Sequence, residues 1–436
     1  AGIPEHRRTA EPMPMNTDND RRQSRLEDAP QTTVASSGPA GCIRRPVPGA
    51  VLTGIFSRNA WGWWIWFLFM AGIVLSTVGN SPTAGDVCAI YIQSGRDLLA
   101  GQPLYAEPYF MYLPTAAFFF IPFTWGPFPL MASLWRIVNL AVFAAGVFKL
   151  SQTGRLDGLA ISFVQISAIV CLLAIGGAKN GQMNLTIAGL LMLSAAAMEE
   201  SRTWTASALM ALSLTLKPTV LPFLLLAAVV HKSTSWRTAL LALAMALLPF
   251  LAQPGEYMIR QYADVPRMLH DTVKMKEGMV YPAITGLLNA SGIHVGDAGR
   301  LALRVLFALA ALAAYLAGRA RLKEAADRSL LLYAIAVGYI LLLSPATERN
   351  TYAIFAPVVG ITLCLAGARR QRGVQALLWL VILSGLLSHT IQKLLSDAPL
   401  AYMVKPAGTI AVIIVILCST FGPGQINKPQ TPRGDQ

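Results

Sequence analysis

Long runs of apolar residues alternate with short polar segments along most of the 436-residue chain. A helix needs about 20 apolar residues to cross roughly 30 Å of hydrocarbon, and most of these runs approach that length. A bilayer core offers no water to backbone groups, so such runs favour helices. The pattern predicts an all-α polytopic membrane protein, a helical bundle of roughly twelve spans. We place the spans at 61–78, 129–149, 157–176, 182–198, 203–216, 219–230, 238–252, 299–318, 329–344, 350–367, 374–393 and 401–419.

Some apolar stretches are too short for an ordinary crossing. Residues 112–125 are interrupted by two prolines, and we interpret them as a re-entrant or very short span. Residues 203–216 and 219–230 form a predicted hairpin with Lys217 at its tip. Both elements need shielding by other helices, because broken backbone at membrane depth persists only inside protein or beside water.

The polar segment 79–112, after the first span, carries one short amphipathic helix. Asp86 precedes this helix and Gly101 ends it, and its apolar and aromatic positions recur at helical spacing, at Val87, Ile90, Tyr91, Ser94 and Leu98. An aspartate just before a helix caps free backbone N–H groups. A carboxylate at the membrane boundary also suits a general base. The two interpretations of Asp86 are compatible, and we keep both.

Basic residues are concentrated before the first span and in alternate connections between the spans. Placing them on the cytoplasmic side gives a disordered cytoplasmic tail over 1–57, a transmembrane domain over 58–420 and a cytoplasmic tail over 421–436. The polar groups that then face outside are the Asp86 loop, the 179–184 turn, the Lys217 tip, the 344–352 turn and the long loop 253–299.

Composition excludes a soluble globular protein, since 54% of the residues are hydrophobic, 13% are charged and the mean hydropathy is +0.52. The formal charge of +13 lies largely in the N-terminal tail and short loops, where it sets topology and contacts anionic lipid. No basic patch alternates with exposed aromatic residues, so we expect no nucleic-acid partner. The five cysteines and five histidines lack metal-ligand spacing, so neither a disulfide framework nor a metal site is predicted.

Polar side chains at the predicted outer boundary are costly in hydrocarbon unless they line a wet cavity. The turn AKNGQMN supplies Lys179, Gln182 and Asn184. Lys217 is well placed to pair with an anion. The alternatives are a plain polar turn at 179–184 and a lysine that extends out of the membrane.

Two further places carry charge near the membrane. The turn SPATERNTY places Glu348 beside Arg349 between two spans. It is either an anion-recognising helix start or an ordinary helix N-terminus capped by Thr347. Arg136 lies within a span, and the sequence does not identify its partner.

One carboxylate and several cations around an outer-face cavity suit a particular reaction. A base deprotonates an acceptor hydroxyl while cations stabilise a phosphate leaving group. The phosphate of a lipid substrate would lie at headgroup depth, with its chain in the bilayer. The rival interpretations are a non-enzymatic transporter or flippase of lipid-linked sugars, and a glycan polymerase or ligase that uses a diphosphate-linked donor.

Five strings recur in one order over about 80–360, namely GDVCAIYIQSGRDLLAGQPLY, YFMYLPTAAFFFIPF, GQMN, LKP and LSPATERNTYAIFAP. With these strings the chain resembles the bacterial GT-C glycosyltransferases that use polyprenyl-phosphate sugars. It resembles most closely glycosyltransferase family 87, whose members depend on polyprenol-phosphate mannose. The resemblance implies a GT-C-type bundle with a helical outer-face loop after the first span.

By this resemblance Asp86 is the catalytic residue. The family's other motifs fall on Tyr112 and Pro114, on Gln182 and Asn184, on Lys217, and on Ser344, Pro345 and Tyr352. Our candidates for donor and acceptor binding are Tyr112, Gln182, Asn184 and Lys217 of these motifs, together with Tyr91, Tyr105, Lys179, Glu348 and Arg349 of this chain. Actinobacterial members carry a His pair after the Ser-Pro of the last string, where this chain has Glu348 and Arg349. That departure leaves the acceptor and the sugar open.

The resemblance further implies a mannosyltransferase-like hexosyltransferase that works without a metal or another cofactor. Its partners would be a polyprenyl-phosphate sugar, a glycan or glycolipid acceptor and the bilayer. We expect the bacterial inner membrane, a cytoplasmic N-terminus and an active site facing the periplasm or the outside.

Overall fold

The computed structural model describes residues 48–79, 86–106, 110–153, 162–277, 282–344, 347–394 and 399–422. The chain divides into two units, 1–52 and 53–436. In the first unit the described residues 48–52 are helical, and the predicted disordered tail otherwise lies outside the described residues. The second unit contains all the other described residues. The first helix begins at Pro48, within the stretch assigned to that tail.

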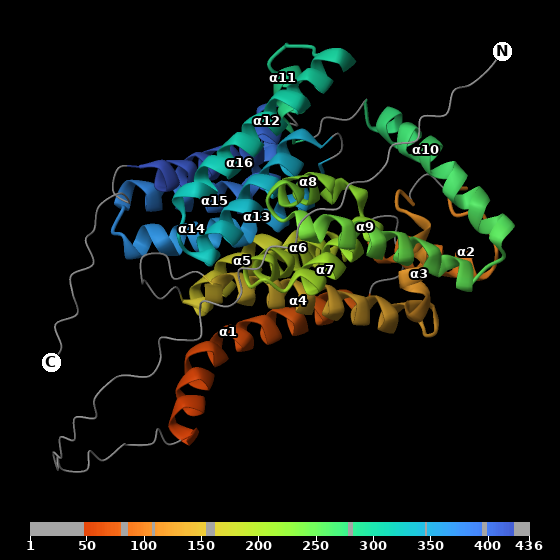
Figure 1. Ribbon diagram of the computed structural model, residues 1–436, viewed down its shortest axis with the longest axis horizontal. Helices are drawn as coiled ribbons and strands as arrows, with labels where there is room; N and C mark the ends of the chain where they lie inside the picture. The colour runs from red at the N-terminus through yellow and green to blue at the C-terminus, as the bar shows by residue number, and fades with distance from the viewer. Residues whose placement is uncertain are drawn as a thin grey trace, which may run out of the picture. The chain divides into compact units, whose positions relative to one another are not determined.

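The described residues form helices and short 3₁₀ turns, and no strand occurs among them (Figure 1). The first half contains α1 (Pro48–Thr77), α2 (Val87–Leu99), α3 (Pro114–Phe120), η1 (Ile121–Thr124), α4 (Phe128–Thr153), α5 (Phe163–Lys179), α6 (Asn184–Glu199), α7 (Thr203–Leu216), η3 (Pro218–Val220) and α8 (Leu221–Val230). The second half contains α9 (Lys232–Leu247), η4 (Leu248–Leu251), α10 (Gly255–Glu277), α11 (Ile284–Ala290), α12 (Asp297–Arg321), α13 (Ala325–Leu343), η5 (Arg349–Phe355), α14 (Ala356–Ala368), α15 (Arg372–Leu394) and α16 (Pro399–Phe421).

Seven helical segments of the described chain are long and apolar enough to cross a membrane. They are 59–77, 128–152, 232–251, 297–321, 325–343, 349–368 and 403–421. The protein is therefore a helical membrane protein, as the hydrophobic runs predict. Shorter apolar helices of 10–17 residues occupy the other predicted spans. The count of roughly twelve crossings stays a prediction, because length and composition do not decide whether these shorter helices cross.

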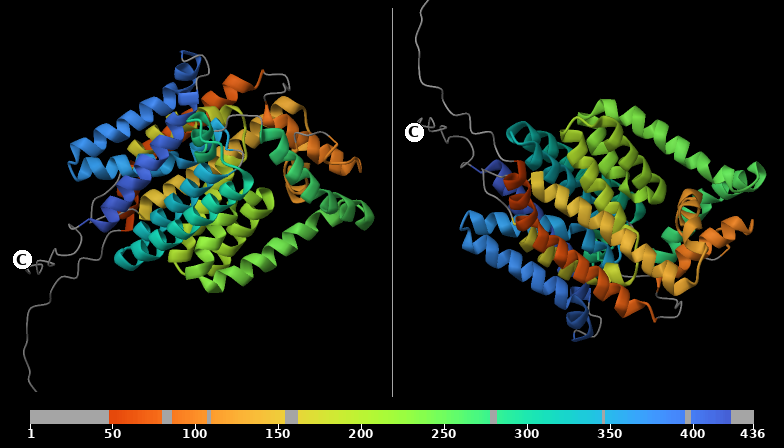
Figure 2. Two further views of the ribbon diagram at one scale, coloured as in Figure 1. Left: turned by 90° about the horizontal axis from the view of Figure 1, so that it is seen from above. Right: turned by 90° about the horizontal axis from the view of Figure 1, so that it is seen from below.

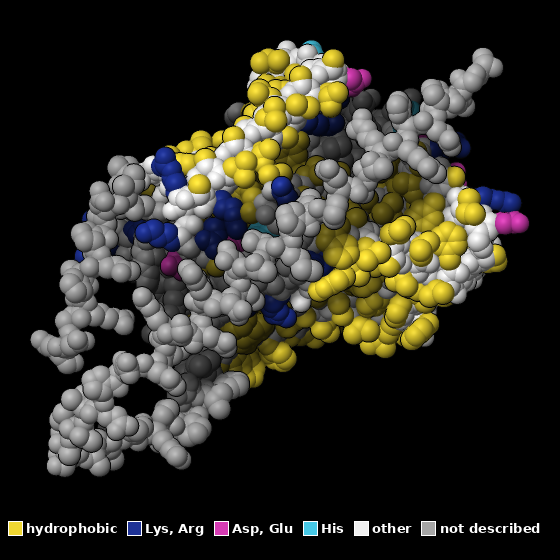
Figure 3. All heavy atoms as spheres, viewed as in Figure 1, with side chains coloured by type: hydrophobic (Ala, Val, Ile, Leu, Met, Phe, Trp, Pro, Cys, Tyr) yellow, Lys and Arg dark blue, Asp and Glu magenta, His cyan; other side chains and the backbone are white. Residues whose placement is uncertain are grey.

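Exposed apolar side chains identify the surfaces that suit lipid. On α9 and η4, Leu240, Leu243 and Leu251 are exposed, and α12 exposes Leu301 and other large residues along its length. In Figure 3 hydrophobic side chains cover these outer faces. By contrast, α13 is buried over most of its length. The bundle therefore has an interior helix and an apolar periphery, the arrangement expected in hydrocarbon.

Helices α4 and α6 cross at backbone contact. A Cβ atom added to Gly189 would lie 2.3 Å from the Val142 carbonyl oxygen, and one added to Gly146 would lie 2.7 Å from Cα of Gly189. Small residues allow membrane helices to approach this closely. Helix α1 lies alongside α4 (Figure 2), where the Trp66 ring meets the Phe143 ring edge-on at 5.8 Å. The crossing fixes α4 relative to the start of α6.

At the other end of α6, buried and exposed acidic groups pair with basic residues of several connections. Glu199 has a side chain that is 5% exposed, and it accepts bonds from Arg319 and from Arg328, the latter at 2.7 Å. The neighbouring Glu200 pairs with Lys149. These connections were all predicted to lie on one side of the membrane, and the structure brings them together.

Candidate functional site

The predicted site residues meet at the turn between α5 and α6, residues 179–184, which we call the hub. Gly181 has a φ of +63°, a conformation that side chains disfavour. A Cβ atom there would also lie 2.1 Å from the Cys88 sulfur. The Gly181 carbonyl accepts a hydrogen bond from Trp135 Nε1 at 2.7 Å. Only glycine fits this position, so the turn is held tightly against α2 and α4.

Asp86 forms a buried ion pair with Arg136. One carboxylate oxygen, Oδ1, accepts the backbone N–H of Cys88 at 2.9 Å, so Asp86 does cap α2. The other, Oδ2, accepts from Arg136 Nη2 at 2.9 Å, and the two side chains are 9% and 2% exposed. Arg136 also donates to the Lys179 carbonyl from Nε and Nη2. Arg136 is thus the link between Asp86 and the 179–184 turn.

Three tyrosines contact one another, and one of them contacts the same turn. The hydroxyls of Tyr91 and Tyr112 lie 2.9 Å apart, Tyr91 Oη accepts from the Met183 backbone N–H at 3.3 Å, and Tyr105 donates to the Tyr112 carbonyl. Burial raises the pKa of Tyr112 to about 12, opposed by the Tyr91 hydrogen bond and increased by the charge of Glu348. Burial also raises the pKa of Tyr91. Both hydroxyls therefore stay protonated near neutral pH, and one of them donates to the other.

A row of polar side chains runs from Lys217 to Glu348. Lys217 Nζ donates to Asn184 Oδ1 at 2.6 Å, and Asn184 Nδ2 donates to Gln182 Oε1 at 3.1 Å. Gln182 Nε2 then donates to Glu348 Oε2 at 2.7 Å. Every bond has the same direction, from the cation toward the carboxylate. The two amides are thereby fixed in orientation.

The structure brings together most of the side chains predicted for the site, with two differences. The Lys179 side chain is exposed, and the contact that Lys179 makes with the cluster is through its carbonyl. The interpretation of Thr347 as a helix cap is wrong. Glu348 is the N-cap of η5 without a side-chain cap bond, and the Thr347 hydroxyl points to the Ile340 carbonyl at 3.5 Å. Pro345 lies outside the described residues.

The loops predicted on the outer side also contact one another. Gln261 of α10 accepts the Leu104 backbone N–H at 2.9 Å, and Tyr257 donates to the Gln102 carbonyl. The segment after α2 is therefore held by α10, which lies within the stretch predicted as the long loop 253–299. The contact is consistent with the prediction that both segments lie on one side of the membrane. The identity of that side stays a prediction.

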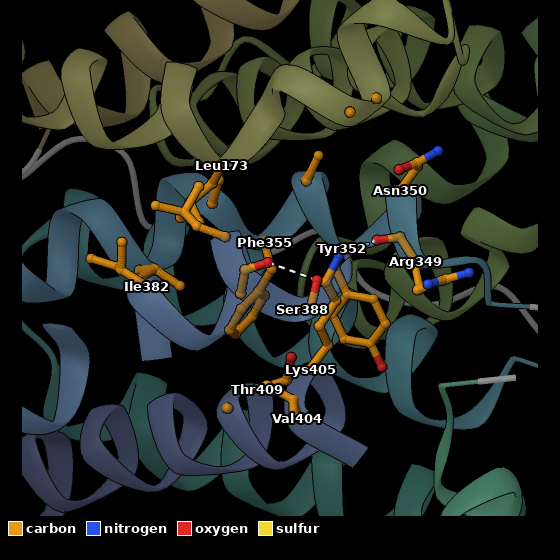
Figure 4. A pocket seen from close by; sticks show the side chains of 18 of the residues that line it. Leu173, Arg349, Asn350, Tyr352, Phe355, Ile382, Ser388, Val404, Lys405 and Thr409 are labelled. Carbon is orange, nitrogen blue, oxygen red and sulfur yellow. Dashed lines mark hydrogen bonds between the residues drawn. The ribbon is translucent and has the colours of Figure 1, made fainter. Parts of the chain in front are cut away.

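A cavity of about 960 Å³ opens beside Glu348, between α5, η5, α15 and α16. Its charged lining residues are Glu348, Arg349 and Lys405. Lys405 Nζ donates to the Arg349 carbonyl at 3.0 Å. Figure 4 shows Arg349 at the side opposite Leu173 and Ile382, so the cavity has a polar and an apolar end. Sequence reasoning missed Lys405, although a lysine within an apolar run is a signal of its own.

No group of three or more His, Cys, Asp or Glu side chains that could hold a metal is found in the parts of the chain that the structure describes. Asp86 is already paired with Arg136, and Glu348 already accepts from Gln182 of the turn. That no metal or cofactor is needed stays a prediction.

The family model of glycosyltransferase family 87 matches residues 110–345, more than half of the chain. The matched stretch runs from the residues before α3 to the end of α13, and includes Arg136, the 179–184 turn and Lys217. No curated protein and no solved structure matches the chain. The chain therefore belongs to glycosyltransferase family 87, and it is a glycosyltransferase with sugar donor and acceptor substrates.

Proposed function

We propose that this member of glycosyltransferase family 87 moves a sugar, mannose in the first instance, from a polyprenyl phosphate to a hydroxyl of an outer-face glycan or glycolipid. The enzyme would act in the bacterial inner membrane, with its N-terminus in the cytoplasm and its site on the periplasmic or outer side.

The observation that carries the proposal is the convergence on the 179–184 turn. Asp86 reaches this turn through Arg136, and Lys217 reaches it through Asn184. Glu348 is bonded to Gln182 of the same turn and lines the cavity. A carboxylate, two cations and a cavity with an apolar end are thereby linked through one fixed element. Such a set fits a lipid-linked donor better than a water-soluble nucleotide sugar.

In the proposed reaction Asp86 is the general base. The acceptor oxygen attacks C1 of the sugar as Asp86 takes its proton, and the bond between C1 and the phosphate oxygen breaks. The electron pair leaves with the polyprenyl phosphate. A single displacement inverts the configuration at C1. Both Asp86 oxygens keep a further lone pair beside the bonds from Cys88 and Arg136, so each can still accept the proton.

The other groups bind and orient. Positive charge on Arg349 stabilises the negative charge that grows on the leaving phosphate, and Lys217 acts through Asn184 and Gln182, whose amides it orients. One of the hydroxyls of Tyr91 and Tyr112 donates to the other, which leaves one hydroxyl hydrogen of the pair to donate to a sugar oxygen. Glu348 and Gln182 can accept and donate to sugar hydroxyls at the edge of the cavity.

The test measures sugar transfer from radiolabelled polyprenyl-phosphate mannose in membranes that contain equal amounts of each variant. Wild type should transfer, and Asp86→Asn should not. Asp297→Asn removes a carboxylate that is 90% exposed on α12, and it should transfer like wild type.

Two outcomes would contradict the proposal. Equal transfer by wild type and Asp86→Asn would remove Asp86 from the mechanism. If no sugar-lipid donor supports transfer but labelled lipid crosses the bilayer in reconstituted vesicles, the protein is a flippase.

A further inference from the structure

The cavity beside Glu348 combines features that suit an amphipathic anion. Its volume of about 960 Å³ is at the upper end of the range of roughly 300–1,000 Å³ found for ligand sites. Arg349, Lys405 and Glu348 leave an excess of one positive charge on its lining. The remaining lining residues are mainly apolar side chains of α5, α14, α15 and α16.

Lys405 is the unusual group of this cavity. It lies within the apolar segment 403–421 and is half-buried. Lys405 lies near the start of this segment, where a lysine ordinarily extends its ammonium into water, so a half-buried lysine that lines a cavity there indicates a function. Its ammonium donates to the Arg349 carbonyl, a dipole that does not neutralise the charge. Within the described residues no carboxylate forms an ion pair with Lys405, so its charge is available to an anion.

The apolar end of the cavity leads to the side of the bundle. Leu172 and Ile175 of α5 and Leu386 of α15 line the cavity and are also exposed. A hydrocarbon chain can therefore extend from the cavity between α5 and α15 into the bilayer. The proposed seat for a headgroup is at Lys405 and Arg349, and Arg349 lies on the side of the cavity opposite Leu173 and Ile382 (Figure 4).

We propose that this cavity binds the lipid carrier, with the phosphate of an isoprenoid phosphate at Lys405 and Arg349 and its chain between α5 and α15. The identity of the lipid rests on the proposed function. The sugar of the donor would then lie near Glu348, which is bonded to Gln182 of the turn that Arg136, the partner of Asp86, also contacts. Much of the lining, from Glu348 to Thr409, lies outside the stretch that the family model matches. Lys405 is therefore assigned by this structure alone.

The experiment measures binding of radiolabelled undecaprenyl phosphate to the purified full chain in detergent. Lys405→Met should weaken it about tenfold, the loss expected for a charge-assisted hydrogen bond. Binding of undecaprenol, which has no phosphate, should be unchanged. Lys405→Arg keeps the charge and should retain most of the affinity. Lys232→Met, which removes an exposed lysine at the start of α9, is the charge control.

A bulky substitution at the apolar end of the cavity provides an independent test, and its control position lies on the same helix. Gly385 of α15 lines the cavity, and a Cβ atom there would meet Leu173 at an ordinary 3.7 Å. Gly385→Phe should weaken binding of both undecaprenyl phosphate and undecaprenol. Gly373, on the same helix, has nothing within 4 Å of an added Cβ, so Gly373→Phe should bind both like wild type.

The binding measurements test the proposed lipid site independently of the proposed transfer reaction. Wild-type binding by both Lys405→Met and Gly385→Phe would overturn the proposal, even if sugar transfer occurs. Displacement by phosphatidylglycerol as effective as by undecaprenyl phosphate would make this a general lipid site and overturn the assignment. Binding that depends on Lys405, in a protein that transfers no sugar, would support the cavity while the proposed function fails.

Discussion

The ion pair of Asp86 and Arg136 is both a structural and a candidate catalytic element, and a double-mutant cycle can separate the two roles. The pair lies at 2.9 Å with side chains 9% and 2% exposed, so its charges are almost fully removed from water. Removing one partner of a buried pair costs roughly 3–5 kcal/mol, because the other charge is left uncompensated. We therefore expect Arg136→Gln to lower the free energy of unfolding by about that amount.

The double variant Asp86→Asn/Arg136→Gln leaves no unpaired charge. Its stability loss should be smaller than the sum of the single losses, by roughly 1–3 kcal/mol for residues in direct contact. If Asp86 is the general base, the double variant regains stability and still transfers no sugar. If Asp86 only holds the fold, transfer returns together with stability.

The assay is equilibrium unfolding of each purified variant in mixed micelles, followed by circular dichroism, with transfer measured on the same preparations. The control is the surface pair of Asp297 with Arg300, at 2.8 Å with Asp297 90% exposed. Asp297→Asn should change stability by no more than about 1 kcal/mol. If Arg136→Gln is as stable as this control, the expectation is wrong, because a buried carboxylate without its partner should lower the free energy of unfolding by more than an exposed one.

Three other substitutions test the hub and its supports. Gly181→Ala should lower the stability by about 1–2 kcal/mol because of the left-handed backbone at this position, and further because the new Cβ would lie 2.1 Å from the Cys88 sulfur. Adding Cys88→Ala should restore only the stability lost through the contact with sulfur, which thermal unfolding of both variants measures. Lys217→Met should raise the KM for the lipid-linked donor about tenfold, since it removes a charge and the 2.6 Å bond that orients Asn184; an unchanged KM would exclude Lys217 from donor binding. Gly189→Ala should destabilise the bundle by about 1–3 kcal/mol through overpacking against α4, whereas Gly373→Ala, in open space, should not.

The hydrophobic pattern was sufficient to predict an all-helical membrane protein. It did not predict α10 and α11, which lie within the stretch 253–299 that we expected to be a loop. Periodicity located α2, and Asp86 and Gly101 marked its two ends. The hairpin tip at Lys217 also follows the sequence, since the residue before a proline disfavours helical backbone. The outer polar groups were expected together because one topology places them on one side, and the structure joins them through the 179–184 turn.

The sequence alone could not predict which side chains contact one another. Arg136 was recognised as a charge within a span, but its partner is 50 positions away and is determined by how α4 packs on the turn. The cavity depends likewise on packing, because α5 and α16 line it from distant parts of the chain. Lys405 could have been singled out by its apolar surroundings. Its relation to Arg349 needs three dimensions.

The acidic residues at the end of α6 differ in when their partners are synthesised. Glu200 pairs with Lys149, which precedes it in the chain, so this contact can form as soon as α6 leaves the ribosome. Glu199 accepts from Arg319 and Arg328, which follow 120 and 129 positions later. The end of α6 therefore reaches its final packing only after α12 and α13 are made. The helices up to α6 are therefore made before α12 and α13 can pack on them, and Glu199 is a residue through which α12 and α13 attach to the end of α6.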